Sequence, residues 1–200
     1  MPRRLLLDND FIFKITSLNL VAEFKALPFV RDRELRHLDA LPYMIRKGSF
    51  RNATPEGIQR ALEWVDTFPA IEAPALQAID RIPPSPGIDP GERLLLGSIL
   101  ETVESSIFTG DKRCIKAIGG LSPELQEAFT GKILCLEAAI YAIVARNDFD
   151  YAAGKVRSGL SCDKALRIIF GGSTPDNKES VLEGLASYLR SVASSPGGFV

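Results

Sequence analysis

The stretch RLLLDNDFIFK, residues 4–14, joins a short apolar run to two carboxylates and then to a second apolar segment. Residues 4–7 have the length and composition of a short buried strand. Residues 11–27 carry apolar side chains at helical spacing, so they predict a helix directly after the strand. Asp8 and Asp10 are therefore expected in a strand-to-helix turn.

A second acidic turn follows in SSIFTGDK, residues 105–112, where a β-prone run ends at Gly110 and Asp111. Strands that alternate with helices predict an α/β fold, with a mostly parallel central sheet and helices on both faces. Parallel strands end at the same edge of such a sheet, and ligands bind outside that edge. We therefore expect Asp8, Asp10 and Asp111 to lie close together.

The string DPGE, residues 89–92, has the spacing of a helix capping box, with Asp89 as the cap and proline in the first helical position. Spacing alone favours a capping role for Glu92. Residues 32–41 are expected to be helical, with Pro42 ending the helix.

Residues after Gly120 are expected to be helical. The predicted organisation is a catalytic α/β core over residues 1–120, a helical region over 121–195 packed on the core, and a flexible tail over 196–200. Within the helical region, Glu137 interrupts an apolar helix and is expected to pair with a lysine, because buried acids are normally paired.

The net charge of −1 over 200 residues lacks the basic excess that is typical of nucleic-acid-binding domains. Any phosphate contact must come from local basic runs, for which the candidates are Arg46 and Lys47, and Lys112 and Arg113 beside Asp111. Three cysteines and one histidine support neither a disulfide framework nor a zinc site. Without a signal peptide or a bilayer-spanning apolar run, the expected location is the cytoplasm, away from membranes.

Carboxylates gathered at one sheet edge repel one another, and a bound cation offsets that repulsion. Mg²⁺ is typically held by a few carboxylates, waters and substrate phosphates. A second ion about 4 Å away would clamp the attacking and leaving oxygens of a phosphodiester. The alternative is structural: Asp8 and Asp10 cap the next helix, and Asp111 forms a turn with Gly110.

The ordered stretches LLLDND, IDPGERLLLGSI and IFTGDKRCIKAI, within residues 4–120, resemble the PIN-domain nucleases, such as the VapC-type toxin ribonucleases. That family has an acid after the first strand, an acid opening a mid-chain helix and an acid after a later strand. The resemblance implies a PIN-like, Mg²⁺- or Mn²⁺-dependent nuclease. By position, Asp8, Glu92 and Asp111 match the catalytic metal ligands. Asp10, a further candidate ligand, stands where the family usually has Asn or Ser.

A further family acid is expected after the first helix, and this chain has no clean match for it. Glu34 is the better candidate and Asp39 the weaker one. The resemblance also implies RNA as the substrate, with DNA as the alternative, and it makes an antitoxin-type protein and a second copy of the chain candidate partners.

Two other readings stay open. DNDFI also resembles the Asp-x-Asp motif of HAD-type phosphatases, which would make Asp8 a nucleophile and Asp10 an acid/base. TGDK imitates the Gly-Asp motif of that family, but Ile115 stands where the family has a further Asp. The third reading is a degenerate PIN-like module that binds RNA or a protein without cleaving it.

Overall fold

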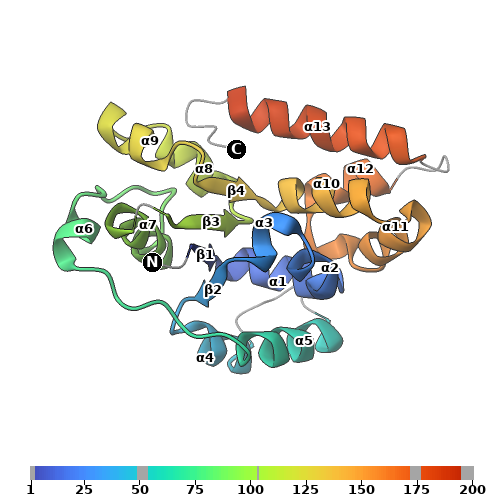
Figure 1. Ribbon diagram of the computed structural model, residues 1–200, viewed down its shortest axis with the longest axis horizontal. Coiled ribbons are helices and arrows are strands. Elements are labelled where there is room, and N and C mark those ends of the chain that lie inside the picture. Colours follow the sequence, from blue (N-terminus) through green and yellow to red (C-terminus); the bar gives the residue numbers. More distant parts are fainter. Residues whose placement is uncertain (1–2, 49–53, 103, 172–176, 195–200) are drawn as a thin grey trace.

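A parallel sheet runs through the middle of the molecule, with helices packed around it (Figure 1). The computed structural model describes residues 3–48, 54–102, 104–171 and 177–194, so the predicted tail over 196–200 lies outside the described residues. The strands are β1 (Arg4–Leu7), β2 (Glu34–His37), β3 (Ser106–Thr109) and β4 (Ile133–Cys135). The helices are α1 (Asn9–Ser17), α2 (Val21–Lys25), α3 (Pro28–Arg31), α4 (Leu41–Arg46), α5 (Pro55–Val65), α6 (Leu76–Asp80), α7 (Pro90–Glu101), α8 (Lys112–Ile118), α9 (Pro123–Phe129), α10 (Leu136–Arg146), α11 (Phe149–Ser158), α12 (Lys164–Phe170) and α13 (Lys178–Ser194), with a 3-10 turn at Leu160–Cys162.

The strands lie in the order β2-β1-β3-β4, and every pairing is parallel. The chain first passes from β1 outward to β2, then returns past β1 to add β3 and β4 on the other side. The winding direction therefore reverses between β1 and β3. In open α/β sheets, the crevice at such a reversal, outside the carboxyl ends of the strands, is where ligands bind.

Both faces of the sheet are buried, which confirms the predicted α/β fold class. Side chains alternate along a strand, and accordingly Leu5 and Leu7 of β1 join one hydrophobic core while Leu6 joins the other. The first core is completed by residues of α1, α2, α5, α10 and α11 among others, and the second by residues of α7, α8 and α9.

Local signals predicted several elements correctly. β1, β3 and the start of α7 lie where the sequence placed them. Thr54 caps α5 by accepting a hydrogen bond from the Gly57 amide at 3.0 Å. The single helix expected over residues 11–27 is instead divided into α1 and α2 at Asn19, which takes a φ of 54°. Asparagine enters this left-handed region more readily than most residues.

The prediction of a helix over residues 32–41 was wrong, because residues 34–37 form the edge strand β2. Pairing with β1, in the register Leu7 to His37, overrides the weak local helical preference. Glu34 and Arg36 place charge on this sheet edge, where charge discourages pairing with another chain, and residues 69–71 cover its carboxyl end through backbone hydrogen bonds with His37. Pro42 lies in the first turn of α4 instead of ending a helix.

The prediction that residues after Gly120 are helical was wrong for Ile133–Cys135, which form β4. β4 pairs with β3, so the predicted core boundary at residue 120 falls between two neighbouring strands. The C-terminal helices share the first hydrophobic core with β1. In Figure 1, α13 runs along the top of the view and α5 along the bottom.

Phe108 of β3 gives a test of this packing. Its side chain is fully buried, and its ring centroid lies 4.7 Å from that of Phe11 and 5.3 Å from that of Phe24. We expect Phe108→Ala to lower the free energy of unfolding by about 3–5 kcal/mol, because the substitution leaves a cavity in the core. Ile168→Ala on α12, where the side chain is 73% exposed, is the control and should change little. Similar urea midpoints for both variants would contradict the core described above.

Candidate functional site

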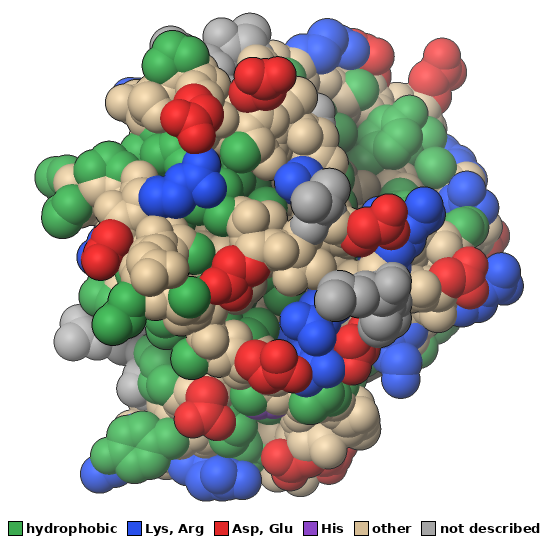
Figure 2. All heavy atoms as spheres, turned by 60° about the vertical axis from the view of Figure 1, so that its left-hand side comes forward, with side chains coloured by type: hydrophobic (Ala, Val, Ile, Leu, Met, Phe, Trp, Pro, Cys, Tyr) green, Lys and Arg blue, Asp and Glu red, His purple; other side chains and the backbone are tan. Residues whose placement is uncertain are grey.

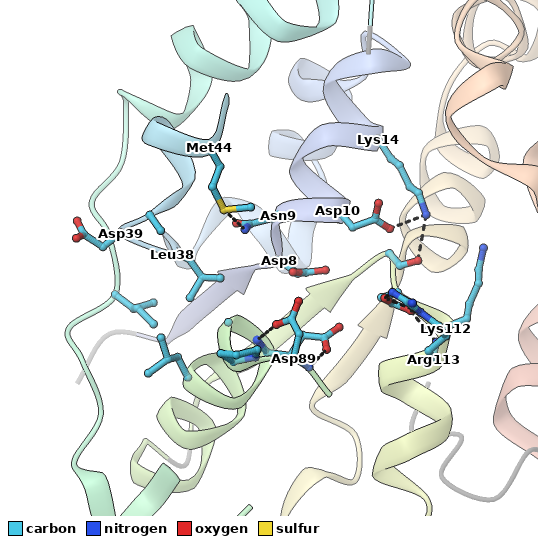
Figure 3. A pocket seen from close by; sticks show the side chains of 18 of the residues that line it. Asp8, Asn9, Asp10, Lys14, Leu38, Asp39, Met44, Asp89, Lys112 and Arg113 are labelled. Atoms are coloured by element: carbon cyan, nitrogen blue, oxygen red, sulfur yellow. Dashed lines mark hydrogen bonds and ion pairs between the residues drawn. The ribbon is translucent and has the colours of Figure 1, made fainter. Parts of the chain in front are cut away.

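A cleft of about 1110 Å³ opens where β1 and β3 end, at the reversal of the sheet (Figure 3). Its walls come from the β1–α1 turn, the β2–α4 connection, the start of α7 and the β3–α8 turn. The acidic residues that line it are Asp8, Asp10, Asp39, Asp89, Glu92 and Asp111. Leu38, Met44 and Ile71 contribute an apolar wall. The strand ends thus bring the three acids predicted there, Asp8, Asp10 and Asp111, into one cleft.

Asp8 lies directly after β1 and is 6% exposed. Its backbone amide donates to the Phe108 carbonyl at 2.9 Å, and its Oδ2 accepts a hydrogen bond from the Thr109 hydroxyl at 3.0 Å. Asp8 is the N-cap residue of α1, but its side chain makes no capping hydrogen bond to that helix. Burial, followed by repulsion from Asp10, raises the pKa of Asp8 to about 7.

Glu92 combines a capping role with a place in the cleft. The predicted capping box is confirmed: the Asp89 amide donates to Glu92 Oε2 at 2.7 Å, and the Glu92 amide donates to Asp89 Oδ1 at 2.8 Å. Glu92 is also 4% exposed and lines the cleft. Burial raises its pKa to about 8, to which the charges of Asp8, Asp89 and Asp111 contribute.

Asp111 lies in the same cleft but in a different electrostatic setting. Its Oδ1 accepts a hydrogen bond from the Arg113 amide at 2.8 Å and caps α8, and its Oδ2 pairs with the Arg113 guanidinium at 2.5 Å. Burial alone would raise the pKa of Asp111, but the hydrogen bonds from Arg113 outweigh burial and lower the pKa. The structural role in a turn and cap therefore holds for Asp111, together with its place in the cleft.

Thr109 connects the two strand ends, and sequence reasoning did not single it out. Its hydroxyl donates to Asp8 Oδ2 and accepts from the Asp111 amide at 3.0 Å. Both turns are thereby fixed relative to each other. The signal in the sequence is the threonine directly before Gly-Asp, but its partner Asp8 is 101 residues away.

Asp10 belongs to the first turn of α1 and pairs with Lys14 of the same helix, whose Nζ is 2.6 Å from Asp10 Oδ2. Lys14 Nζ also lies 3.0 Å from Asp163 Oδ2 and 3.1 Å from the Gly110 carbonyl oxygen. Figure 3 shows the Lys14 side chain reaching over Asp10 toward the β3–α8 turn. A Cβ at Gly110 would lie 2.4 Å from Asp10 Oδ2, so a larger residue there would displace the Asp10 carboxylate.

The pairing continues beyond Lys14 as a chain of alternating charges. Lys112 Nζ lies 3.1 Å from Asp163 Oδ2 and 2.7 Å from Glu137 Oε1. We call the series Asp10, Lys14, Asp163, Lys112 and Glu137 the charge ladder. Asp163 also caps α12, and Glu137 is fully buried at the start of α10. The predicted pairing of Glu137 with a lysine is confirmed, although neither of its oxygens has a hydrogen bond of good geometry.

The remaining predicted residues divide by location. Glu34, the better candidate for the additional family acid, lies in β2 outside the cleft and pairs with Arg36, whereas Asp39 lines the cleft. Arg46 and Lys47 are not among the described residues that line it.

Lys112 and Arg113 do line the cleft, but carboxylates already engage their charged groups. Their role as phosphate contacts therefore stays a prediction, in which a phosphate would have to share these cations with the carboxylates. The face shown in Figure 2 carries mixed acidic and basic side chains without a continuous basic surface.

The donor chemistry of the cleft suits a hard cation. Asp8 and Glu92 offer carboxylate oxygens that form no ion pair with a lysine or arginine among the described residues, and burial raises the pKa of both. Asn9, between Asp8 and Asp10, has a buried Oδ1 without a hydrogen-bond partner. Among the described residues, no group of three or more His, Cys, Asp or Glu side chains is arranged to hold a metal ion. Mg²⁺ usually takes one or two carboxylates and keeps several waters, so the residues fit a partly hydrated ion.

No family model and no solved structure matches the chain. The chain is similar to the acetyl-coenzyme A carboxylase carboxyl transferase subunit alpha of Phenylobacterium zucineum (strain HLK1), with 28% identity over 101 residues, which are 50% of this chain and 32% of that protein. The corresponding subunit of Methylobacterium sp. (strain 4-46) is 29% identical over 99 residues, or 48% of this chain and 31% of that protein. The match thus spans about a third of the length of these relatives. Within the described residues, no helix is long and apolar enough to cross a membrane.

The charge ladder predicts that Lys112 is needed for stability. Replacing it with methionine would leave Glu137 as a buried charge without a partner, so we expect Lys112→Met to lower the free energy of unfolding by about 3–5 kcal/mol. Lys112→Met combined with Glu137→Leu should recover most of that loss, because the uncompensated charge is gone.

Arg113→Met is the matched control, because Arg113 is next to Lys112 in the chain but its side chain is 82% exposed. The urea midpoint of Arg113→Met should therefore stay close to that of the parent. Urea unfolding of the four proteins measures the effect. Equal midpoints for Lys112→Met and Arg113→Met would show that the ladder does not stabilise the fold.

Proposed function

We propose that the protein is a metal-dependent nuclease that hydrolyses phosphodiester bonds, with RNA as the substrate and with Mg²⁺ or Mn²⁺ as its cofactor. The observation that carries the proposal is the convergence of Asp8, Glu92 and Asp111, from three separate elements, on one cleft at the reversal of the sheet. The PIN-like family relationship belongs to the same proposal. So do an antitoxin-type partner and a homodimer, which rest on the resemblance alone.

Asp8, Glu92 and the amide oxygen of Asn9 are the groups that would hold the ion. When bound, a divalent ion lowers the pKa of a water molecule and neutralises charge on the phosphate. The chain itself orients the ligands: Thr109 fixes the Asp8 carboxylate, and the Asp89 amide fixes one oxygen of Glu92. Arg113 keeps Asp111 ionised, which favours a positive or hydrogen-donating group beside it.

The alternatives have less support. A HAD-type phosphatase would need an acid at position 115, and Ile115 is instead a buried core residue. A carboxyl-transfer role on acetyl-coenzyme A follows only from the names of relatives that match about half of this chain. A PIN-like module that binds RNA or a protein without cleaving it would have the same cleft, so a cleavage assay is needed to distinguish it from a nuclease.

We expect Asp8→Asn and Glu92→Gln each to reduce Mn²⁺-dependent cleavage of single-stranded RNA by at least about a hundredfold, because each removes a charge that the ion requires. Glu34→Gln is the matched control, since Glu34 lies in β2 outside the cleft and should leave cleavage unchanged.

Asp39→Asn tests the additional family acid, and a loss of activity there with none in Glu34→Gln would assign that role to Asp39. Absence of any Mn²⁺-dependent cleavage in the parent would favour the binding module. Cleavage that persists in both Asp8→Asn and Glu92→Gln would contradict the proposed site.

The raised pKa values of Asp8 and Glu92 predict how pH acts on the metal-free protein. Protonated carboxyls impose no charge penalty, so these groups leave the fold most stable at low pH, and stability falls as pH rises through their pKa values of about 7 and about 8. A divalent ion competes with those protons. Mn²⁺ should therefore raise the melting temperature more at about pH 9 than at about pH 6.

Asp8→Asn should reduce this pH dependence, because one of the two titrating groups is removed. Calorimetry with and without Mn²⁺ at both pH values gives the measurement. A stabilisation by Mn²⁺ that is independent of pH would place the ion away from Asp8 and Glu92.

A further inference from the structure

The ammonium group of Lys14 lies in a set of oxygens that resembles the ligand set of a metal ion. Its neighbours are Asp10 Oδ2 at 2.6 Å, Asp163 Oδ2 at 3.0 Å and the Gly110 carbonyl oxygen at 3.1 Å. Two carboxylates and a backbone carbonyl are the oxygen types that bind hard divalent cations. They come from α1, the start of α12 and the β3–α8 turn, so the fold assembles this oxygen set from three distant segments.

The oxygen set closely surrounds a positive charge. The Lys14 side chain is 11% exposed and that of Asp163 is 3% exposed, so water contributes little to balancing their charges. The missing side chain of Gly110 leaves room for the Asp10 carboxylate and the Lys14 side chain, because a Cβ there would lie 2.4 Å from Asp10 Oδ2. A lysine ammonium is a compact point charge, and burying it is favourable only where acids compensate its lost hydration.

This oxygen set adjoins the carboxylates of the proposed metal site. Asp10 and Lys14 line the same cleft as Asp8, Glu92 and Asp111. Asp10 is two residues from Asp8, and its charge is one of the causes of the altered pKa of Asp8. The cleft is thus divided into two halves. One half contains Asp8 and Glu92, which form no ion pair within the described part of the chain, and the other contains Asp10, which already pairs with the Lys14 ammonium.

We propose that Lys14 is a resident cation that occupies the position of a second divalent ion, so that the cleft binds one divalent ion per chain. Two-metal nucleases place both ions about 3.5–4 Å apart to clamp the attacking and leaving oxygens. Here the ammonium supplies one fixed positive charge, and Asp10 serves as its ligand. This inference rests on the proposed function for the identity of the other ion.

Metal stoichiometry tests the proposal without reference to activity. Equilibrium dialysis and calorimetric titration with Mn²⁺ should give one ion per parent chain. Lys14→Met removes the ammonium and frees Asp10, Asp163 and the Gly110 carbonyl, so it should bind two ions. Lys14→Arg retains a cation and should bind one.

Lys155→Met is the control for loss of a lysine from an acid pair. Lys155 Nζ lies 2.7 Å from Glu23 Oε1, outside the cleft, and its removal should leave the stoichiometry at one.

The outcomes separate this inference from the proposed function. Two ions in the parent, or one ion in a folded Lys14→Met variant of a one-ion parent, would overturn the Lys14 inference and leave the nuclease proposal standing. No ion in the parent would remove the proposed metal site. If the parent binds no ion, one ion bound by Lys14→Met would still support the inference that Lys14 occupies an ion position. No ion bound by Lys14→Met would then overturn that inference. If circular dichroism shows that Lys14→Met is unfolded, the number of ions bound by the parent tests the inference. One bound ion supports the inference, and two or none overturn it.

Discussion

The contact of one ammonium group, that of Lys14, with oxygens of three segments is the constraint on which the cleft depends. Lys14 ties α1 to the β3–α8 turn and to the start of α12, and Lys112 extends the same charge ladder to α10. Buried ion pairs seldom add net stability over apolar packing, but loss of one partner is costly. The ladder therefore links these segments at a cost if one partner is lost, and it connects the first turn of α1 to the acidic turn that ends β3.

Electrostatic balance differs across the cleft, and this difference gives the site its chemical character. Asp10 and Asp163 are matched by lysines, and Asp111 is matched by Arg113. Within the described parts of the chain, no lysine or arginine pairs with Asp8 or Glu92 in this way, and burial raises the pKa of both. A divalent ion beside Asp8 and Glu92 would compensate the charges of both acids, as the Lys14 ammonium compensates the charges of Asp10 and Asp163.

Each correctly predicted element is indicated by a sequence pattern that lies within the element or within a few residues of it. The apolar run of β1 and the capping box before α7 act locally, so they can be read from sequence. The two missed strands are both sheet edges. β2 has a charged pattern and β4 spans three residues, and each is a strand only because β1 or β3 offers it a partner.

The sequence by itself determined that acids follow the apolar strand-forming runs, and that Glu92 stands at a helix start. Strand ends and helix caps depend on neighbouring residues, so Asp8 and Asp111 could be chosen from the chain alone. Only the tertiary structure decided which distant groups meet them. Parallel register and helix packing place Asp39 in the cleft and Glu34 outside it, and they bring Asp163 to Lys14. These contacts join residues far apart in the chain, whose proximity no local pattern encodes.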